Sequence, residues 1–202
     1  MLNDSHCHFF STPFFAALAR QRGRDETPMQ LCQALQWDDP GAADALAERW
    51  VTTLDDAGVA RAALIASVPG DEGSVATAVA RHPARFVGFF MIDPAADDAI
   101  PRAQRALGEL KLRCVCLFPA MHHVPLDDDR VHRVVEVAAA HPGTAVFAHC
   151  GVLSVGVRRK LGLPSRFDLR LGDPLAWRAW PPRSPPSRSS FRISARGCFE
   201  RR

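Results

Sequence analysis

The sequence predicts an α/β protein whose parallel strands alternate with helices, as in a (β/α)8 barrel of the TIM type that is truncated after about five βα units. From residue 42 onward, segments with helical periodicity alternate with short apolar runs. These runs are nearly continuous, as expected of parallel strands covered by helices on both faces. A doubly wound open sheet is the alternative. Against it, a histidine pair follows the first strand in place of a glycine-rich phosphate loop, which also disfavours glycine-rich nucleotide binding.

The predicted elements follow in order along the chain. The helix over residues 42–57 carries Leu46, Trp50 and Leu54 at helical spacing, and Gly58 ends it. Strands are expected at residues 2–8, 61–68, 86–92, 112–118 and 144–150, and helices at 13–20, 42–57, 72–81, 99–110 and 129–140. The chain of 202 residues is long enough for one sizeable core.

The cysteine and apolar patterns predict a reduced protein in the cytoplasm. The six cysteines show no spaced disulfide framework. Cys114 and Cys116 lie inside an apolar run and are expected to pack in the core. No apolar run approaches the roughly 18 residues of a membrane span, and no secretory signal is visible, so no membrane contact is expected.

The segment Asp4-Ser5-His6-Cys7-His8 is the most informative motif of the chain. Residues i and i+2 of a strand point to the same face, so His6 and His8 should aim at one point while Cys7 aims away. His149 ends the fifth predicted strand, and catalytic groups of such barrels lie at the carboxyl ends of the strands. Three neutral imidazoles from two strands suit a zinc ion that keeps one position open for water, as a hydrolase or decarboxylase requires.

These residues resemble the amidohydrolase superfamily, and more narrowly the amidohydrolase-related branch that includes aminocarboxymuconate-semialdehyde decarboxylase. The resemblance covers roughly residues 1–176 and rests on the motif at 4–8 and on Phe147-Ala148-His149-Cys150-Gly151. It implies one divalent metal, usually zinc, bound by His6, His8 and His149. The strand-six histidine and strand-eight aspartate of that branch have no counterpart here, so the catalytic acid-base residue is unknown. The fourth strand carries no lysine that could bridge two metals.

A competing interpretation is the group of deoxyribonuclease relatives, which also place a histidine pair after an aspartate in strand one. Those proteins usually continue with an acidic residue where Phe9 stands. The apolar pair Phe9-Phe10 therefore favours the decarboxylase-like branch.

Other polar residues have weaker claims to the site. His122 and His123 follow the fourth strand on the catalytic face and are candidates for substrate binding. His82 and His141 precede strands and are expected to be structural. Further residues are expected to begin helices or turns, namely Asp93, Asp127 and Asp128.

The last 26 residues differ in composition from the rest. Residues 1–176 have a net charge of −3, whereas residues 177–202 contain seven arginines and one glutamate and are rich in proline and serine. One interpretation is a disordered basic tail. The other is a changed reading frame, because reading residues 191–200 two nucleotides later, with G or C in the third codon positions, yields a histidine-glycine motif like that of strand six. Nucleic-acid binding by the tail is disfavoured.

The sequence thus predicts a metal-dependent hydrolase or carboxy-lyase that acts on a small carboxylated or aromatic-derived molecule. Without the later strands, weak or absent catalysis is expected from the chain. The alternative is a non-catalytic remnant or an interaction protein, and the sequence leaves a homo-oligomer open.

Overall fold

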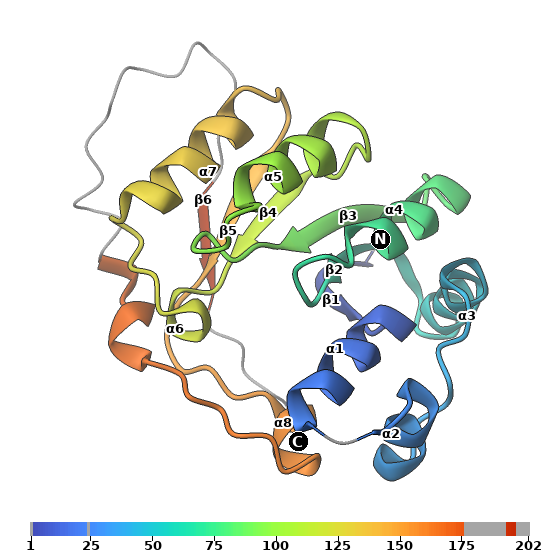
Figure 1. Cartoon of the computed structure of the whole chain (residues 1–202). Helices are drawn as coiled ribbons and strands as arrows, with labels where there is room; N and C mark the ends of the chain where they lie inside the picture. The colour runs from blue at the N-terminus through green and yellow to red at the C-terminus, as the bar shows by residue number, and fades with distance from the viewer. Residues whose placement is uncertain (1, 24, 176–192, 197–202) are drawn as a thin grey trace. The chain divides into compact units, whose positions relative to one another are not determined.

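The computed structural model describes residues 2–23, 25–175 and 193–196 (Figure 1). The chain divides into two compact units. The first comprises Met1–Phe90 with Val155–Pro164, and the second comprises Met91–Ser154 with Ser165–Arg202. Parallel strands joined through helices make up both, so the chain is an α/β protein with the elements of a partial (β/α)8 barrel.

The first unit is built on a parallel sheet. Strand β1 pairs with β2, and β2 pairs with β3. These strands are β1 (Leu2–Phe9), β2 (Val59–Ala66) and β3 (Phe86–Met91). The last five residues of β2 are all buried, which explains the unbroken apolar run in the sequence.

Four helices and a short fifth one complete the first unit. Helices α3 and α4 pack against each other and against β2. The helices are α1 (Thr12–Arg22), α2 (Pro28–Leu35), α3 (Ala43–Asp56), α4 (Glu72–Arg81) and α8 (Gly156–Lys160). Gly58 has a φ of +66°, the left-handed conformation that ends a helix at little cost for glycine, as predicted.

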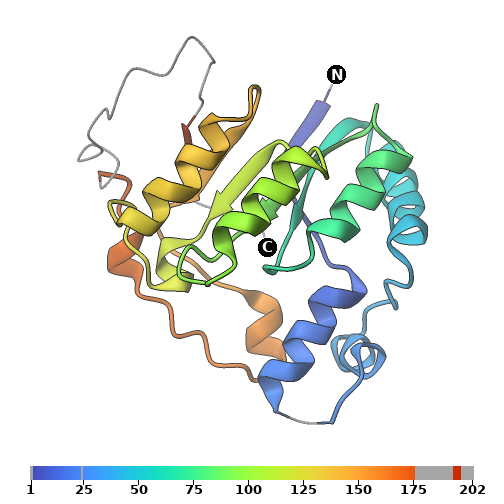
Figure 2. The ribbon, with the colours of Figure 1, turned by 45° about the horizontal axis from the view of Figure 1, so that its top comes forward.

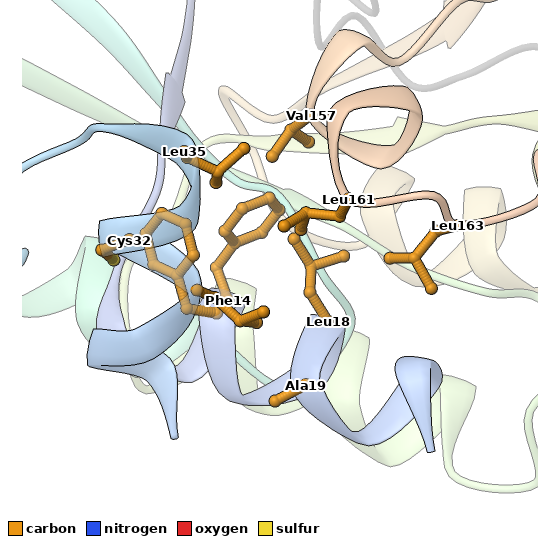
Figure 3. Packing of buried hydrophobic residues seen from close by; sticks show 10 residues of the cluster. Phe14, Leu18, Ala19, Cys32, Leu35, Val157, Leu161 and Leu163 are labelled. Atoms are coloured by element: carbon orange, nitrogen blue, oxygen red, sulfur yellow. The ribbon is translucent and has the colours of Figure 1, made fainter. Parts of the chain in front are cut away.

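An apolar cluster of buried side chains joins α1, α2 and α8 within this unit (Figure 3). Phe14, Leu18 and Leu35 contribute side chains that are at most 5% exposed. Val157 and Leu161 of the α8 segment pack against them. The cluster explains why the long loop between β1 and β2 is folded, because its helices have an apolar core of their own.

The second unit repeats the alternation of helices and strands. Its strands β4 and β5 are parallel, and α5 and α7 lie side by side (Figure 2). Its elements are α5 (Ala99–Gly108), β4 (Cys114–Leu117), α6 (Pro119–His122), α7 (Asp129–Ala139), β5 (Ala145–His149), the 3-10 helix η1 (Leu169–Gly172) and β6 (Ile193–Arg196).

Strand β6 was not predicted from the sequence. It lies in the basic tail and pairs in parallel with β5, with Ile193 opposite Val146 and Arg196 opposite His149. A sixth strand here gives the backbone groups of β5 a partner on that side. Residues 176–192 and 197–202 lie outside the described residues, so the disordered-tail and reading-frame hypotheses both stay predictions.

The remaining predictions agree with the structure to within a few residues at the ends of the elements. The helices α2, α6 and α8 were not predicted. Among the residues described, no helix is long and apolar enough to cross a membrane. The five described cysteines are free and buried, and Cys198 lies outside the described residues.

Candidate metal site

Strand β1 carries a bulge at the histidine motif. Asp4 is opposite Ala62 and Cys7 is opposite Leu64, so β1 advances three residues while β2 advances two. The extra residue breaks the regular ladder, as bulges next to functional sites often do. The Oδ1 atom of Asp4 accepts a hydrogen bond from the backbone N–H of His6 at 3.0 Å. The side chain of Asp4 thus stabilises the bulge at the first histidine.

The two histidines of β1 lie on the same face, as predicted. Their Nε2 atoms are 3.2 Å apart, and the ring centroids are 4.9 Å apart. Two imidazole nitrogens bound to one tetrahedral zinc at about 2.0–2.1 Å would be roughly 3.3–3.4 Å apart. The separation of the His6 and His8 nitrogens therefore fits a shared cation.

Two neighbours fix the ring of His8. Its Nδ1 atom is 2.9 Å from the Oγ atom of Ser67, which follows β2 directly. Its ring stacks on Phe10 with centroids 5.7 Å apart and an interplanar angle of 11°. Ser67 was not singled out in the sequence, although it is the first polar residue after the buried run of β2. Its contact with His8 depends on the pairing of β1 with β2.

Cys7 lies between the two histidines but faces the core. Its side chain is 7% exposed. Burial raises the pKa of the thiol to about 12, with a further contribution from Asp4. The thiol is therefore neutral near pH 7 in the metal-free chain, which agrees with a packing role for Cys7.

The third predicted ligand, His149, ends β5 in the second unit. It is 2% exposed and stacks on Phe118, with ring centroids 5.4 Å apart. Its Nε2 atom is 3.4 Å from the carbonyl oxygen of Val152, whereas its Nδ1 atom is buried and has no hydrogen-bond partner among the residues that the structure describes. Burial lowers the pKa of His149, so the imidazole is neutral near pH 7. A neutral ring with an unpartnered buried nitrogen is suited to bind a metal.

The histidine pair after β4 separates into two environments. His123 ends α6 in the left-handed conformation, and its Nε2 atom contacts the carbonyl oxygen of Arg166. The Nδ1 atom of His122 is instead buried, without a hydrogen-bond partner among the described residues. Burial lowers the pKa of this ring, and the charge of Asp93 opposes that effect. Of the two candidates for substrate binding, His122 has a ring nitrogen that could contact a ligand, whereas the ring of His123 contacts the backbone of Arg166.

A buried carboxylate near the ends of β1 and β2 was missed in the sequence. Asp71 is 2% exposed, and one of its carboxylate oxygens accepts a hydrogen bond from the hydroxyl of Ser11. Burial raises the pKa of Asp71. The Ser11 oxygen also caps α1 by accepting from the backbone N–H of Phe14 at 3.2 Å. The pair links the start of α1 to the start of α4.

The residues expected to be structural have structural contacts. His82 is 3.1 Å from a carboxylate oxygen of Glu48, and the Nδ1 atom of His141 is 2.8 Å from the carbonyl oxygen of Val137. Asp128 caps α7, as predicted. Asp93 accepts a hydrogen bond from the backbone N–H of Ala95 in a turn. Cys114 and Cys116 are at most 2% exposed, which confirms their place in the core.

His6 and His8 belong to the first unit and His149 to the second. Within the described part of the chain, the His, Cys, Asp and Glu side chains form no group of three or more that could hold a metal ion. The common site of all three residues stays a prediction.

One solved structure with a TM-score above 0.5 supports the fold. A 5-carboxyvanillate decarboxylase from Novosphingobium aromaticivorans, solved with manganese and 3-methoxy-4-hydroxy-5-nitrobenzoic acid, matches 88% of the chain with a TM-score of 0.54 at 14% identity. The chain spans 60% of the length of that protein. An uncharacterized TIM-barrel protein from Bordetella bronchiseptica also matches, with a TM-score of 0.49 at 16% identity. The match covers 80% of the chain and 62% of the Bordetella protein.

A probable 2-pyrone-4,6-dicarboxylic acid hydrolase from Acinetobacter baumannii, solved with citric acid, also matches. It covers 74% of the chain and 49% of its own length, with a TM-score of 0.45 at 15% identity. No curated protein sequence matches the chain. A family model described as amidohydrolase matches residues 4–187, which include all three candidate ligands. The chain belongs to the amidohydrolase family.

Proposed function

We propose that the chain binds one divalent metal ion, zinc in the first instance, through His6, His8 and His149. The observation that carries the proposal is the 3.2 Å separation of the His6 and His8 Nε2 atoms, which matches two ligands of one cation. The buried Nδ1 atom of His149 has no hydrogen-bond partner in the described part of the chain, which supports His149 as the third ligand. All three donors are nitrogens, which suit zinc better than calcium or magnesium.

The reaction that we propose is hydrolysis or decarboxylation of a small carboxylated or aromatic-derived molecule. When bound, the metal supplies an activated water or polarises a substrate oxygen. The residues of the chain supply the rest: His6 and His8 present nitrogens from one strand face, and Phe10 covers the His8 ring. His122 is our candidate for contacting substrate, because its ring is held neutral by burial and faces the charge of Asp93.

The experiment is a metal titration followed by an activity screen. The purified chain, stripped with a chelator, is titrated with Zn²⁺ and with Mn²⁺, and stoichiometry is read by native mass spectrometry. Release of CO2 or of a hydrolysis product is then measured with hydroxylated benzoic acids and lactones. One ion per chain and turnover lost on His8→Ala would support the proposal, whereas a chain that binds neither ion would refute it.

The second candidate is a non-catalytic role, favoured because no residue of the sequence matches the strand-six histidine of the resembled branch. A chain that binds one metal tightly but turns over none of these substrates would support this candidate over the first.

A further inference from the structure

Ser67 has two partners for one hydroxyl group. Its Oγ atom lies 2.9 Å from the Nδ1 atom of His8 and 3.0 Å from the carbonyl oxygen of Ile65. The side chain is 7% exposed. Both distances are within the range of ordinary hydrogen bonds. Ser67 lies next to the carboxyl end of β2, and His8 lies near the end of the adjacent strand β1.

The proton count decides the direction of each hydrogen bond. A hydroxyl group has one proton to donate, and a carbonyl oxygen can only accept. The proton of Ser67 is therefore directed to the carbonyl oxygen of Ile65. The Oγ atom then accepts from His8, whose Nδ1 must carry the hydrogen. A neutral His8 ring with its hydrogen on Nδ1 has a lone pair on Nε2, which is the form that a metal ligand needs.

The contact between the two histidines agrees with this assignment. The Nε2 atoms of His6 and His8 are 3.2 Å apart. If His8 Nε2 carries a lone pair, it accepts a hydrogen bond from the N–H at Nε2 of His6 in the metal-free protein. One consistent set of proton positions thus covers Ile65, Ser67, His8 and His6.

We propose that Ser67 is a positioning residue that fixes His8 in the tautomer with hydrogen on Nδ1, so that Nε2 is ready to bind the metal. The proposal rests on the metal-binding function proposed above and adds a residue outside the histidine set. A histidine ligand commonly donates its second ring N–H to a neighbouring acceptor, and loss of such an acceptor costs about 10–100-fold in metal affinity. Here the acceptor is the Ser67 hydroxyl, which in turn donates to the carbonyl oxygen of Ile65.

The experiment has one readout without metal and one with metal. The ¹⁵N shifts of the His8 ring in the metal-free full chain distinguish the two tautomers. Zn²⁺ affinity is measured by competition with a chromophoric chelator. Both are recorded for the wild type, for Ser67→Ala and for Ser67→Thr, which keeps the hydroxyl. Thr77→Ala is the matched control, because it removes a hydroxyl that donates to the carbonyl oxygen of Gly73 at 3.0 Å on an exposed part of α4.

We expect wild-type His8 to carry its hydrogen on Nδ1. Ser67→Ala should give a mixture of tautomers and bind Zn²⁺ about 10–100-fold more weakly. Ser67→Thr should keep the wild-type tautomer, and Thr77→Ala should change neither readout.

Two results would overturn the inference: hydrogen on Nε2 of His8 in the wild type, or an unchanged tautomer in Ser67→Ala. A wild-type chain that binds no Zn²⁺ would refute the proposed function, and the tautomer readout would still decide the role of Ser67.

Discussion

The histidines that we propose as metal ligands lie in two surroundings that are organised in different ways. On β1, neighbouring groups from the sheet hold the histidine pair: Asp4 supports the bulge, and Ser67 and Phe10 fix the second ring. On β5, His149 is more deeply buried, yet its Nδ1 atom has no hydrogen-bond partner among the described residues. The pair is held by local contacts, whereas the single histidine has a buried polar atom that a ligand could satisfy. The ring positions on β1 are therefore set by neighbouring side chains, and the ring on β5 keeps one nitrogen available.

The largest expected effect comes from removing a histidine of the pair. His8→Ala removes one of the two imidazole nitrogens that β1 contributes to the proposed metal site. The loss of Zn²⁺ affinity should exceed the roughly 10–100-fold that follows loss of an outer partner. His82→Ala is the matched control, since His82 contacts Glu48 and ends α4. Equal Zn²⁺ affinity of the two variants, measured by chelator competition, would contradict the assignment of the pair.

A second variant separates binding from stability at β5. His149→Leu removes an unsatisfied buried nitrogen, which costs about 1–3 kcal/mol to bury, but it also loses the ring stacking on Phe118, worth about 0.5–1.5 kcal/mol. We expect the metal-free protein to change by no more than about 1 kcal/mol in urea unfolding, while Zn²⁺ affinity falls sharply. A loss of more than about 2 kcal/mol with unchanged affinity would make His149 a core residue.

A smaller effect, on stability, is expected at the close backbone contact between Gly151 and Gly172. A Cβ atom on Gly172 would lie 3.0 Å from the carbonyl oxygen of Gly151. The two backbones cannot easily move apart, because the N–H of Gly151 donates a hydrogen bond to the carbonyl oxygen of Gly172 at 2.7 Å. Gly172→Ala should cost about 1–3 kcal/mol of unfolding free energy. Gly73→Ala is the control, because its Cβ would meet nothing within 4 Å and alanine favours a helix. Equal stability of Gly172→Ala and Gly73→Ala would show that the backbone at Gly151 moves to accommodate the added methyl group.

The smallest expected effect concerns a helix cap in each unit. Asp128 caps α7 and Thr27 caps α2. Replacing either residue with alanine should cost about 1 kcal/mol in urea unfolding. Only the Asp128 contribution should depend on pH.

The Arg130 side chain lowers the pKa of Asp128 from 3.8 to about 2. A lowered folded-state pKa means that this stabilisation is present above about pH 4 and is lost as the pH falls towards 2. The Asp128→Ala penalty should therefore shrink over that range, whereas the Thr27→Ala penalty should not. Parallel pH dependence of the two variants would contradict the assignment.

Most of the fold could be predicted from the spacing of apolar residues and from helix-breaking residues. The helix α3 followed from its apolar spacing and Gly58, and β2 and β5 followed from unbroken apolar runs. Helix α2 was missed although Thr27 and Gln30 form a capping box that the sequence contains. Strand β6 could not be predicted, because its pairing with β5 is a long-range contact and its surroundings in the sequence are rich in arginine, proline and serine.

The candidate site could be predicted only in part. The same-face position of His6 and His8 follows from the two-residue period of a strand. The bulge at His6 and the contact of Ser67 with His8 depend on the register between β1 and β2, which periodicity does not specify. The buried Asp71 was missed for a similar reason, because its partner Ser11 is 60 residues away in the sequence.

The most direct test of the central claim is X-ray absorption spectroscopy at the zinc edge on the full chain loaded with one equivalent of Zn²⁺. A site built from the three histidines predicts imidazole scattering from three nitrogens at about 2.0–2.1 Å, reduced to two in His149→Leu. A spectrum dominated by sulfur at about 2.3 Å, or one that His149→Leu leaves unchanged, would contradict a site built from His6, His8 and His149.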